Sequence, residues 1–176
     1  MILTTIKDVI EISTSIINSL SIAIAGGWIL YKFILQQEKY PNINFTVDIN
    51  TIGKQDNYWI IELIAIIDNK GKAQHKMNEF NFDLNALFLN DKLRIEEKWG
   101  NQIDFPNELI SGSFLPKHAA FFFVDPGTTA KYSFVTKVPE NTSFLILHST
   151  FKYATRRNRS HTAEKTINLQ SQINQS

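Results

Sequence analysis

The sequence contains no cysteine in 176 residues, which excludes disulfide frameworks, thiolate metal sites and cysteine nucleophiles. Glycine and proline are scarce, at 7 and 5 residues, whereas phenylalanine reaches 13. This composition is typical of a packed β domain and argues against a disordered chain. The formal net charge is only +1, so no overall basic field favours nucleic acid, and we expect no nucleic-acid partner.

Sequence patterns of common active and metal sites are also missing. The sequence has no glycine-rich phosphate loop and no nucleophile elbow. Glu96 and Glu97 are adjacent, so on a strand they point to opposite faces and do not pair as acid and base. The histidines include no pair at the i, i+4 spacing of helical metal sites; His75 and His161 lie in expected turns and His148 on an expected strand. We therefore expect no enzyme, cofactor or metal site, with a site assembled from distant strands as the alternative.

The chain does have one long uncharged run near its start, the twenty residues from Ile12 to Tyr31. An α-helix of that length spans about 30 Å, which is the thickness of a bilayer core. Trp28 and Tyr31 beside Lys32 are typical of a membrane–water interface. We therefore predict a single-pass transmembrane helix within an N-terminal segment of residues 1–39.

Two other interpretations of this run stay open. Ala23-Ile24-Ala25 resembles a signal-peptide cleavage site, although the residues beyond it remain apolar. The polar first half is also compatible with a buried or interfacial helix. For a transmembrane helix, the flanking charges predict the orientation. Positive residues collect on the cytoplasmic side, and more of them follow the run than precede it, so we predict a cytoplasmic domain from Lys32, Lys39 and Lys54.

Small residues recur at every fourth position of the run. Ser15, Ser19, Ala23 and Gly27 therefore line one helix face, with Asn18 beside them. Such a face lets a second helix approach closely. We predict that it mediates self-association or docking on a partner's membrane helix; the alternative is that small residues are simply common in membrane helices.

After Pro41 the hydrophobic period changes from helical to two. Ile43 to Ile49 alternate strictly with polar residues, which predicts a half-buried strand, and residues 53–57 form an expected turn. Tyr58 to Asp68 is apolar on both faces and should be a central strand. The domain is assigned to residues 40–169, and residues 170–176 form an expected disordered polar tail. Its remaining expected strands are Phe80–Phe88, Leu93–Trp99, Ile103–Leu109, Ala119–Val124, Lys131–Val138, Phe144–Tyr153 and His161–Leu169.

Two stretches carry a resemblance to a known architecture. The segment from Asp125 to Phe144 resembles the late strand pair of immunoglobulin-like or fibronectin-III-like sandwiches, and Ile61 to Gly71 resembles an early strand and turn of the same class. The resemblance implies a mainly β chain: one N-terminal transmembrane helix followed by an antiparallel immunoglobulin-like β-sandwich. The cysteine pair of immunoglobulin domains is missing, so no antibody-like identity follows.

Basic residues cluster in two expected turns. Thr155 to His161 reads as a hairpin tip, and Asp68 to Lys72 as another turn. Such residues are often only solvated charges, but they also suit anionic lipid or an acidic protein partner. With two strands in the middle of the domain, both turns fall at its membrane-facing end. The candidate contacts are Lys70, Lys72, Lys76, Arg156, Arg157 and Arg159.

The run Phe121-Phe122-Phe123 predicts a central strand, with an exposed patch as the alternative. Taken together, the sequence favours a membrane-anchored, non-catalytic binding or scaffold protein whose β-sandwich meets a protein partner near the bilayer. Two alternatives stay open. One is a membrane-active effector whose helix oligomerises through the small-residue face, and the other is an accessory subunit of a membrane complex.

Overall fold

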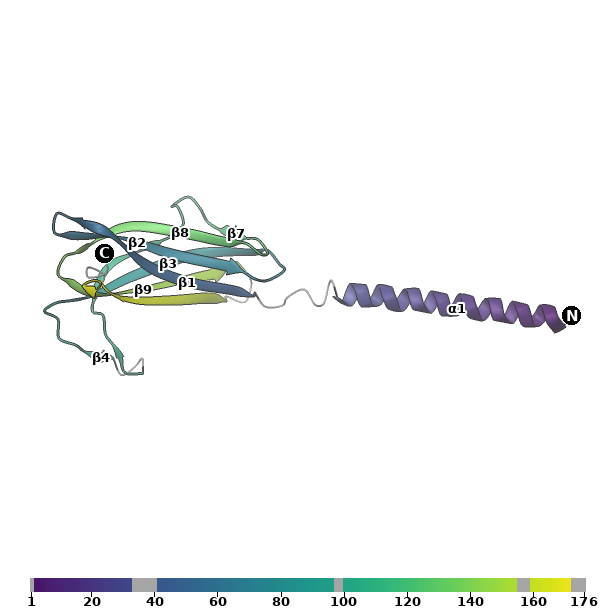
Figure 1. Cartoon of the computed structure of the whole chain (residues 1–176). Coiled ribbons are helices and arrows are strands. Elements are labelled where there is room, and N and C mark those ends of the chain that lie inside the picture. Colours follow the sequence, from purple (N-terminus) through teal and green to yellow (C-terminus); the bar gives the residue numbers. More distant parts are fainter. Residues whose placement is uncertain (1, 33–40, 97–99, 155–158, 172–176) are drawn as a thin grey trace. The chain divides into compact units, whose positions relative to one another are not determined.

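The computed structural model describes residues 2–32, 41–96, 100–154 and 159–171. The chain divides into two compact units, Met1–Tyr40 and Pro41–Ser176. The first unit carries the helix α1, and the second carries all the strands, which pair antiparallel (Figure 1). The chain is therefore mainly β, with one helix at its N-terminal side.

The helix α1 runs from Ile2 to Leu30 and ends in a short π-helical turn. Its segment Ile10–Leu30 has a mean hydropathy of 1.4 over 21 residues, none of them buried. At 1.5 Å per residue this segment is about 30 Å long, so it is long and apolar enough to span a membrane. The Thr14 and Ser21 hydroxyls donate to the carbonyl oxygens four residues earlier, at 2.8 Å each, which satisfies these polar groups within the helix.

The first sheet has three antiparallel strands in the order β1-β2-β8. They are β1 Ile43–Gln55, β2 Tyr58–Asn69 and β8 Thr129–Pro139. β2 lies in the middle, as its apolar character on both faces predicted. Its inward-facing side chains are fully buried: Ile61, Leu63, Ala65 and Ile67.

The hairpin between β1 and β2 is tighter than predicted. We expected a turn over residues 53–57, but β1 continues to Gln55, and only Asp56 and Asn57 connect the strands. Both have positive φ, 48° and 62°, which is the conformation of a type I′ turn and matches the twist of a hairpin. A bulge at Ile52 absorbs the extra residue and shifts the register.

The second sheet has the order β10-β9-β3-β6, and β7 also pairs with β3. A separate two-stranded ladder joins β4 and β5. Their bounds are β3 His75–Phe88, β4 Ile95–Glu96, β5 Gln102–Ile103, β6 Asn107–Ser113, β7 Phe122–Val124, β9 Thr142–Tyr153 and β10 Ser160–Asn168.

The middle of the domain differs from the sequence prediction. The expected strand Ile103–Leu109 is split, because Pro106 has no N–H to donate to a ladder, and β6 begins only at Asn107 and extends to Ser113. β6 and β7 then follow the same edge of β3 one after the other. The expected turn at His75 was also wrong, because His75 begins β3. His161 lies in β10, as the expected strand His161–Leu169 predicted, and not in a turn.

The buried faces of the two sheets pack on one another through aromatic rings. Ring centroids of Phe45 and Phe151 lie 5.0 Å apart, and those of Phe82 and Phe134 lie 4.9 Å apart. Phe80, fully buried, meets Tyr132 of β8 edge-on at 5.2 Å. Each such pair adds about 0.5–1.5 kcal/mol beyond the burial of its surface, so these rings fix how the sheets face each other.

The register gives the domain two distinct ends. At the end where β1 begins, Ile43 pairs with Asn69, and Met77 pairs with Tyr153; we call this the proximal end. At the opposite end, Gln55 pairs with Tyr58; we call this the distal end. The candidate sites described next lie at these two ends.

Candidate functional site

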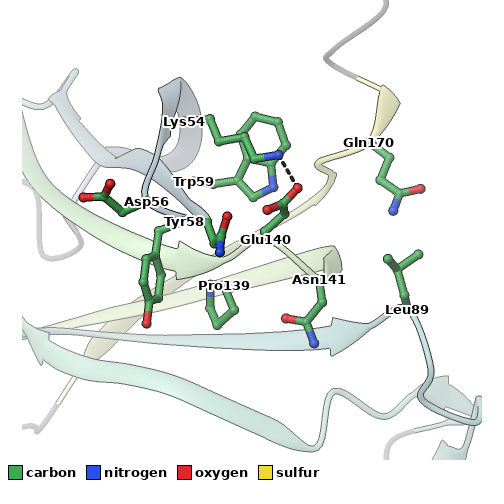
Figure 2. A pocket seen from close by; sticks show the side chains of 10 residues that line it. Lys54, Asp56, Tyr58, Trp59, Leu89, Pro139, Glu140, Asn141 and Gln170 are labelled. Atoms are coloured by element: carbon green, nitrogen blue, oxygen red, sulfur yellow. Dashed lines mark hydrogen bonds and ion pairs between the residues drawn. The ribbon is translucent and has the colours of Figure 1, made fainter.

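An open groove of about 1180 Å³ lies at the distal end (Figure 2). It is formed by the β1–β2 hairpin, the β8–β9 turn and the residues that follow β3 and β10. Its lining combines aromatic, aliphatic and charged side chains: Lys54, Asp56, Asn57, Tyr58, Trp59, Leu89, Pro139, Glu140, Asn141 and Gln170.

Aromatic side chains under lysine ammonium groups form the wall of the groove. Trp59 is half-buried, with the Lys54 ammonium 5.4 Å from its ring centroid, and Lys54 also pairs with Glu140. Tyr58 is exposed, and the Lys137 ammonium lies 4.3 Å from its ring centroid. Leu89 is 56% exposed at the other side. Such a mixture of Trp, Tyr and charge is typical of a protein-binding hot spot.

Backbone hydrogen bonds hold the rim of the groove. The Glu140 N–H donates to the Asn57 carbonyl oxygen at 3.0 Å, which ties the β8–β9 turn to the β1–β2 hairpin. The Leu89 N–H donates to the Asn141 carbonyl oxygen at 2.9 Å. The rim is therefore fixed before any ligand binds, which lowers the entropic cost of binding.

Sequence reasoning missed this groove. Its residues come from four places in the chain, and no spacing links them. The one local signal was Asp56-Asn57 followed directly by Tyr58-Trp59, which places two large aromatic residues at a hairpin tip.

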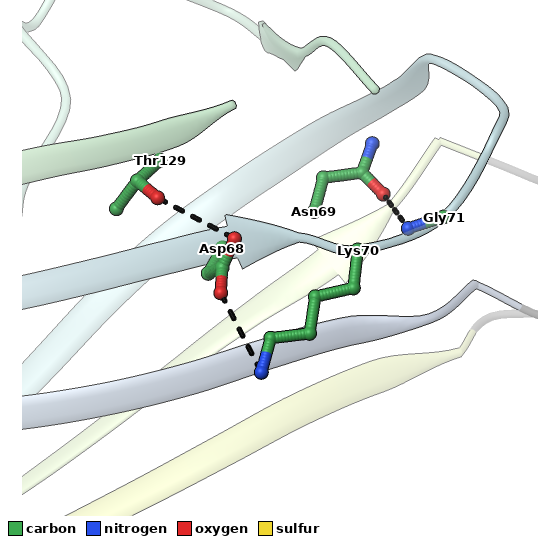
Figure 3. Close-up of polar contacts among 5 residues, drawn as sticks. All are labelled: Asp68, Asn69, Lys70, Gly71 and Thr129. Carbon is green, nitrogen blue, oxygen red and sulfur yellow. Dashed lines mark hydrogen bonds and ion pairs between the residues drawn. The ribbon is translucent and has the colours of Figure 1, made fainter. Parts of the chain in front are cut away.

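The first predicted basic turn lies at the proximal end. The Lys70 N–H donates to the Asn42 carbonyl oxygen at 2.9 Å, just before β1 begins, and the Lys70 ammonium lies 3.8 Å from Asp68 (Figure 3). The Lys76 ammonium lies 3.9 Å from the centroid of Phe121. Lys72, which lies between Lys70 and Lys76 in the sequence, is exposed.

Asn69 holds this turn from inside. It is fully buried, and its side-chain oxygen accepts from the Gly71 N–H at 3.0 Å (Figure 3). Its amide donates to the carbonyl oxygens of Ala73 and Val124, at 2.9 and 3.0 Å. The turn that carries the lysines is therefore tied both to itself and to β7.

The second predicted basic turn reaches the same end. The Tyr153 N–H donates to the Arg159 carbonyl oxygen at 2.9 Å, and Tyr153 pairs with Met77 near the start of β3. Burial raises the pKa of the Tyr153 hydroxyl, and the charge of Arg159 opposes that rise. Arg159 thus lies at the end that carries Lys70, whereas Arg156 and Arg157 lie outside the described residues.

The three consecutive phenylalanines do not form a central strand, and that prediction was wrong. β7 has three residues and, within the described chain, pairs only with β3. Phe122 points inward and is buried, whereas Phe121 and Phe123 are 46% and 48% exposed. Their ring centroids lie 5.4 Å apart, so they form one exposed aromatic pair.

The predicted helix-association residues Ser15, Asn18, Ser19, Ala23 and Gly27 all lie on α1 and are exposed. The Ser19 hydroxyl donates to the Ser15 carbonyl oxygen at 2.9 Å, so this proton is used within the helix. No atom lies within 4 Å of a Cβ placed on Gly27. Gly27 borders a shallow depression with Trp28 and Tyr31, whose ring centroids lie 6.0 Å apart.

Within the described parts of the chain, no three His, Asp or Glu side chains come together as a metal site. His148 lies 3.7 Å from Glu164, and both are exposed on the outer face of the second sheet. His148 also lies 3.4 Å from the hydroxyl of the half-buried Thr150. Asp83 lies opposite His148 in the β3–β9 ladder. Its carboxylate accepts a hydrogen bond from the Ser111 hydroxyl at 2.6 Å.

No protein-family model matches the chain, and no curated protein matches it. Similar solved structures include structural-genomics target SoR45, with 16% identity, a TM-score of 0.46, and coverage of 74% of this chain and 88% of that one. A Bordetella pertussis protein described as ApaA has 14% identity and a TM-score of 0.48, covering 74% of this chain and 95% of that one.

The sporulation control protein Spo0M of Bacillus subtilis has 9% identity and a TM-score of 0.42, covering 70% of this chain and 47% of that one. None of these three descriptions names an immunoglobulin or fibronectin family. At these identities and TM-scores, the three structures identify neither a family nor a function for this chain.

Proposed function

We propose that this chain is a single-pass membrane protein whose domain, an immunoglobulin-like β-sandwich, binds a protein partner without catalysis. The observation that carries the proposal is the exposed apolar segment Ile10–Leu30, which shares one chain with a separate β unit. An apolar helix of this length with no buried residue needs either a bilayer or another protein to cover it. The packing of two antiparallel sheets through their buried faces supports the sandwich type.

The distal groove is the proposed partner site. β1 has 13 residues, so its end at the groove lies about 40 Å from its start at Ile43. A partner bound there would meet Tyr58, Trp59 and Leu89, with Lys54 and Glu140 at the rim. We infer a protein segment with an apolar anchor and at least one charged group.

Site-specific photocrosslinking tests the partner site. A photoreactive amino acid at Leu89 should capture one defined protein, and Tyr58→Ala should weaken that capture at least several-fold. The same photoreactive group at Val135, exposed on the outer face of β8, is the matched control. Equal capture from both positions, or capture that is insensitive to Tyr58→Ala, would contradict the groove as the site.

Membrane extraction and labelling test the anchor and the proposed cytoplasmic side. The chain should stay in the membrane pellet after alkaline extraction, and release into the supernatant would contradict a spanning helix. Because the sequence has no cysteine, Val135→Cys gives a unique thiol. A membrane-impermeant maleimide should label it only after the membrane is opened.

The prediction of a cytoplasmic domain rests on Lys32 and Lys39. Lys54 adds little to it, because Lys54 lies near the distal end and pairs with Glu140.

The second candidate function is assembly through the helix. The chain would then be an effector that perturbs the bilayer or a subunit of a larger membrane complex. The observation that favours it is the open face at Gly27, where a second helix backbone could approach closely.

A further inference from the structure

A small exposed surface at the proximal end combines aromatic rings with cations. We call Lys76, Phe121 and Phe123 the aromatic-basic edge. Lys76 lies directly opposite Phe123 in the β3–β7 ladder, and its ammonium lies 3.9 Å from the centroid of Phe121. Because Phe122 faces the core, its two neighbours must face out. The core thus fixes the position of two half-exposed phenylalanines.

Charge around this edge is predominantly positive. Lys70, Lys72 and Arg159 lie at the same end of the domain. Among the described residues, nearby carboxylates also have partners, and Glu79 pairs with Lys152. Asp68 is 3.8 Å from the Lys70 ammonium, and Asp125 accepts from the Gln74 amide at 2.6 Å.

We propose that the aromatic-basic edge docks the domain on the headgroups of an anionic phospholipid leaflet. Aromatic rings and lysine side chains are the groups that favour the membrane–water interface, where the rings contact acyl chains and the ammonium groups contact lipid phosphates. Each cation near an anionic leaflet strengthens the attraction about fivefold. The exposed rings and the ammonium group of the edge are therefore better suited to the headgroup region of a bilayer than to bulk water.

The chain itself keeps the edge within reach of a bilayer, and here the inference rests on the proposed membrane anchor. Ten residues separate Lys32, at the end of α1, from Ile43, at the start of β1. Even fully extended, the chain from Lys32 to Ile43 reaches at most about 40 Å. Ile43 lies at the proximal end, so a membrane-embedded α1 holds this end at a high effective concentration near the headgroups.

A unique cysteine reports docking in the full-length protein. Ala120→Cys, next to Phe121 and exposed, is labelled with an environment-sensitive fluorophore, and Gln170→Cys at the distal end is the control position. The chain is placed in nanodiscs of phosphatidylcholine with and without phosphatidylserine. The emission at position 120 should shift to the blue in phosphatidylserine discs and revert at high salt, and position 170 should not respond.

Variants then assign the effect to the edge. Phe121→Ser with Phe123→Ser should abolish the shift, and Lys76→Gln should lower the docking equilibrium about fivefold, which corresponds to about 1 kcal/mol. The distal lysine–aromatic pair supplies the matched control: Lys137→Gln with Tyr58→Ser removes a contact of similar geometry, 4.3 Å long, and should leave the shift unchanged. Thermal melting checks that each variant is folded.

The outcomes separate docking from anchoring. No shift in either lipid, equal shifts in both, or an equal loss in the distal control would overturn the docking proposal. A shift that depends on protein concentration rather than on phosphatidylserine would assign the edge to a second copy of the chain and overturn it as well. A chain that fails to enter nanodiscs contradicts the anchor instead. Co-sedimentation with anionic and neutral vesicles, using the same variants, then still decides whether the edge binds lipid.

Discussion

The side-chain amide of Asn69 donates a hydrogen bond to the carbonyl oxygen of Val124, 3.0 Å away and fully buried. This bond joins the end of β2 in the first sheet to the end of β7 in the second. Because Phe121 directly precedes β7 and Phe123 lies within it, the position of the aromatic-basic edge depends on an asparagine that contacts no solvent.

We expect Asn69→Ala to lower the free energy of unfolding by about 2 kcal/mol or more. The substitution leaves the Gly71 N–H and the carbonyl oxygens of Ala73 and Val124 without their partner, and each buried unsatisfied group costs about 1–3 kcal/mol. Urea denaturation measures the change. Asn44→Ala, on the exposed face of β1, is the control and should shift stability by no more than about 0.5 kcal/mol. Equal effects of the two substitutions would contradict the role of Asn69.

We expect Gly112→Ala to destabilise the domain by about 1–3 kcal/mol through overpacking. A Cβ at this position would lie 2.9 Å from the Phe82 Cζ atom, and Phe82 is fully buried and has no free space to move into. Gly53→Ala is the matched control in β1, where no atom lies within 4 Å of the added Cβ. Chemical denaturation should separate the two, and a stable Gly112→Ala variant would show that the ring shifts freely.

We expect Tyr153→Phe to leave the stability unchanged or to raise it by about 1 kcal/mol. The Tyr153 hydroxyl is buried, and the described residues offer it no hydrogen-bond partner. Removing an unsatisfied polar group while keeping the ring recovers its desolvation cost. Thermal denaturation tests this, and a clear loss of stability would indicate a hydrogen bond to a residue outside the described ranges.

We expect the domain to lose stability in mild acid through His161. Its ring stacks on Phe151 at 5.3 Å, and burial lowers its pKa. The folded state then binds the proton more weakly than the unfolded state, so stability is fully present above about pH 6.5 and falls as the pH drops from there toward the lowered folded pKa. His161→Phe should flatten this part of the pH–stability curve, whereas His118→Gln, at an exposed position, should not. An unchanged curve in His161→Phe would assign the acid sensitivity elsewhere.

We expect Ala23→Leu with Gly27→Leu to weaken self-association of the full-length chain in detergent. The larger side chains fill the helix face on which a second backbone would pack. Ser21→Leu with Ala25→Leu, on the opposite face, provides a control that adds a similar volume. Energy transfer between labelled chains measures the monomer fraction. If both pairs of substitutions give the same fraction, the small-residue face does not mediate association.

Periodicity predicted most of the fold. The alternation of Phe80, Phe82 and Leu84 marked a buried strand face, and all three are fully buried. Local patterns also predicted two other features. The uncharged run predicted the helix, and the apolar residues on both faces of β2 predicted its central position.

The errors arose where local pattern and tertiary context disagree. A run of three phenylalanines predicts a central strand, but only contacts with β3 decide that β7 lies at an edge and exposes two of them. The basic turns could be placed at one end only by counting strands, and the count assumed that successive strands always reverse direction. β6 and β7 instead run in the same direction along β3, and Arg159 lies at the end that carries Lys70 by a different path of the chain. The distal groove could not be predicted, because residues as distant as Lys54 and Gln170 meet there only after folding.

The division of one sheet edge into β6 and β7 affects whether another chain can pair with that edge. An unbroken edge strand offers a row of free N–H and carbonyl groups on which another polypeptide can pair. Here the segments have only seven and three residues, and the chain leaves the ladder between them. Along this edge a neighbouring copy of the chain therefore finds a poor template for strand pairing, whereas β1 and β8 form the longer edges of the first sheet.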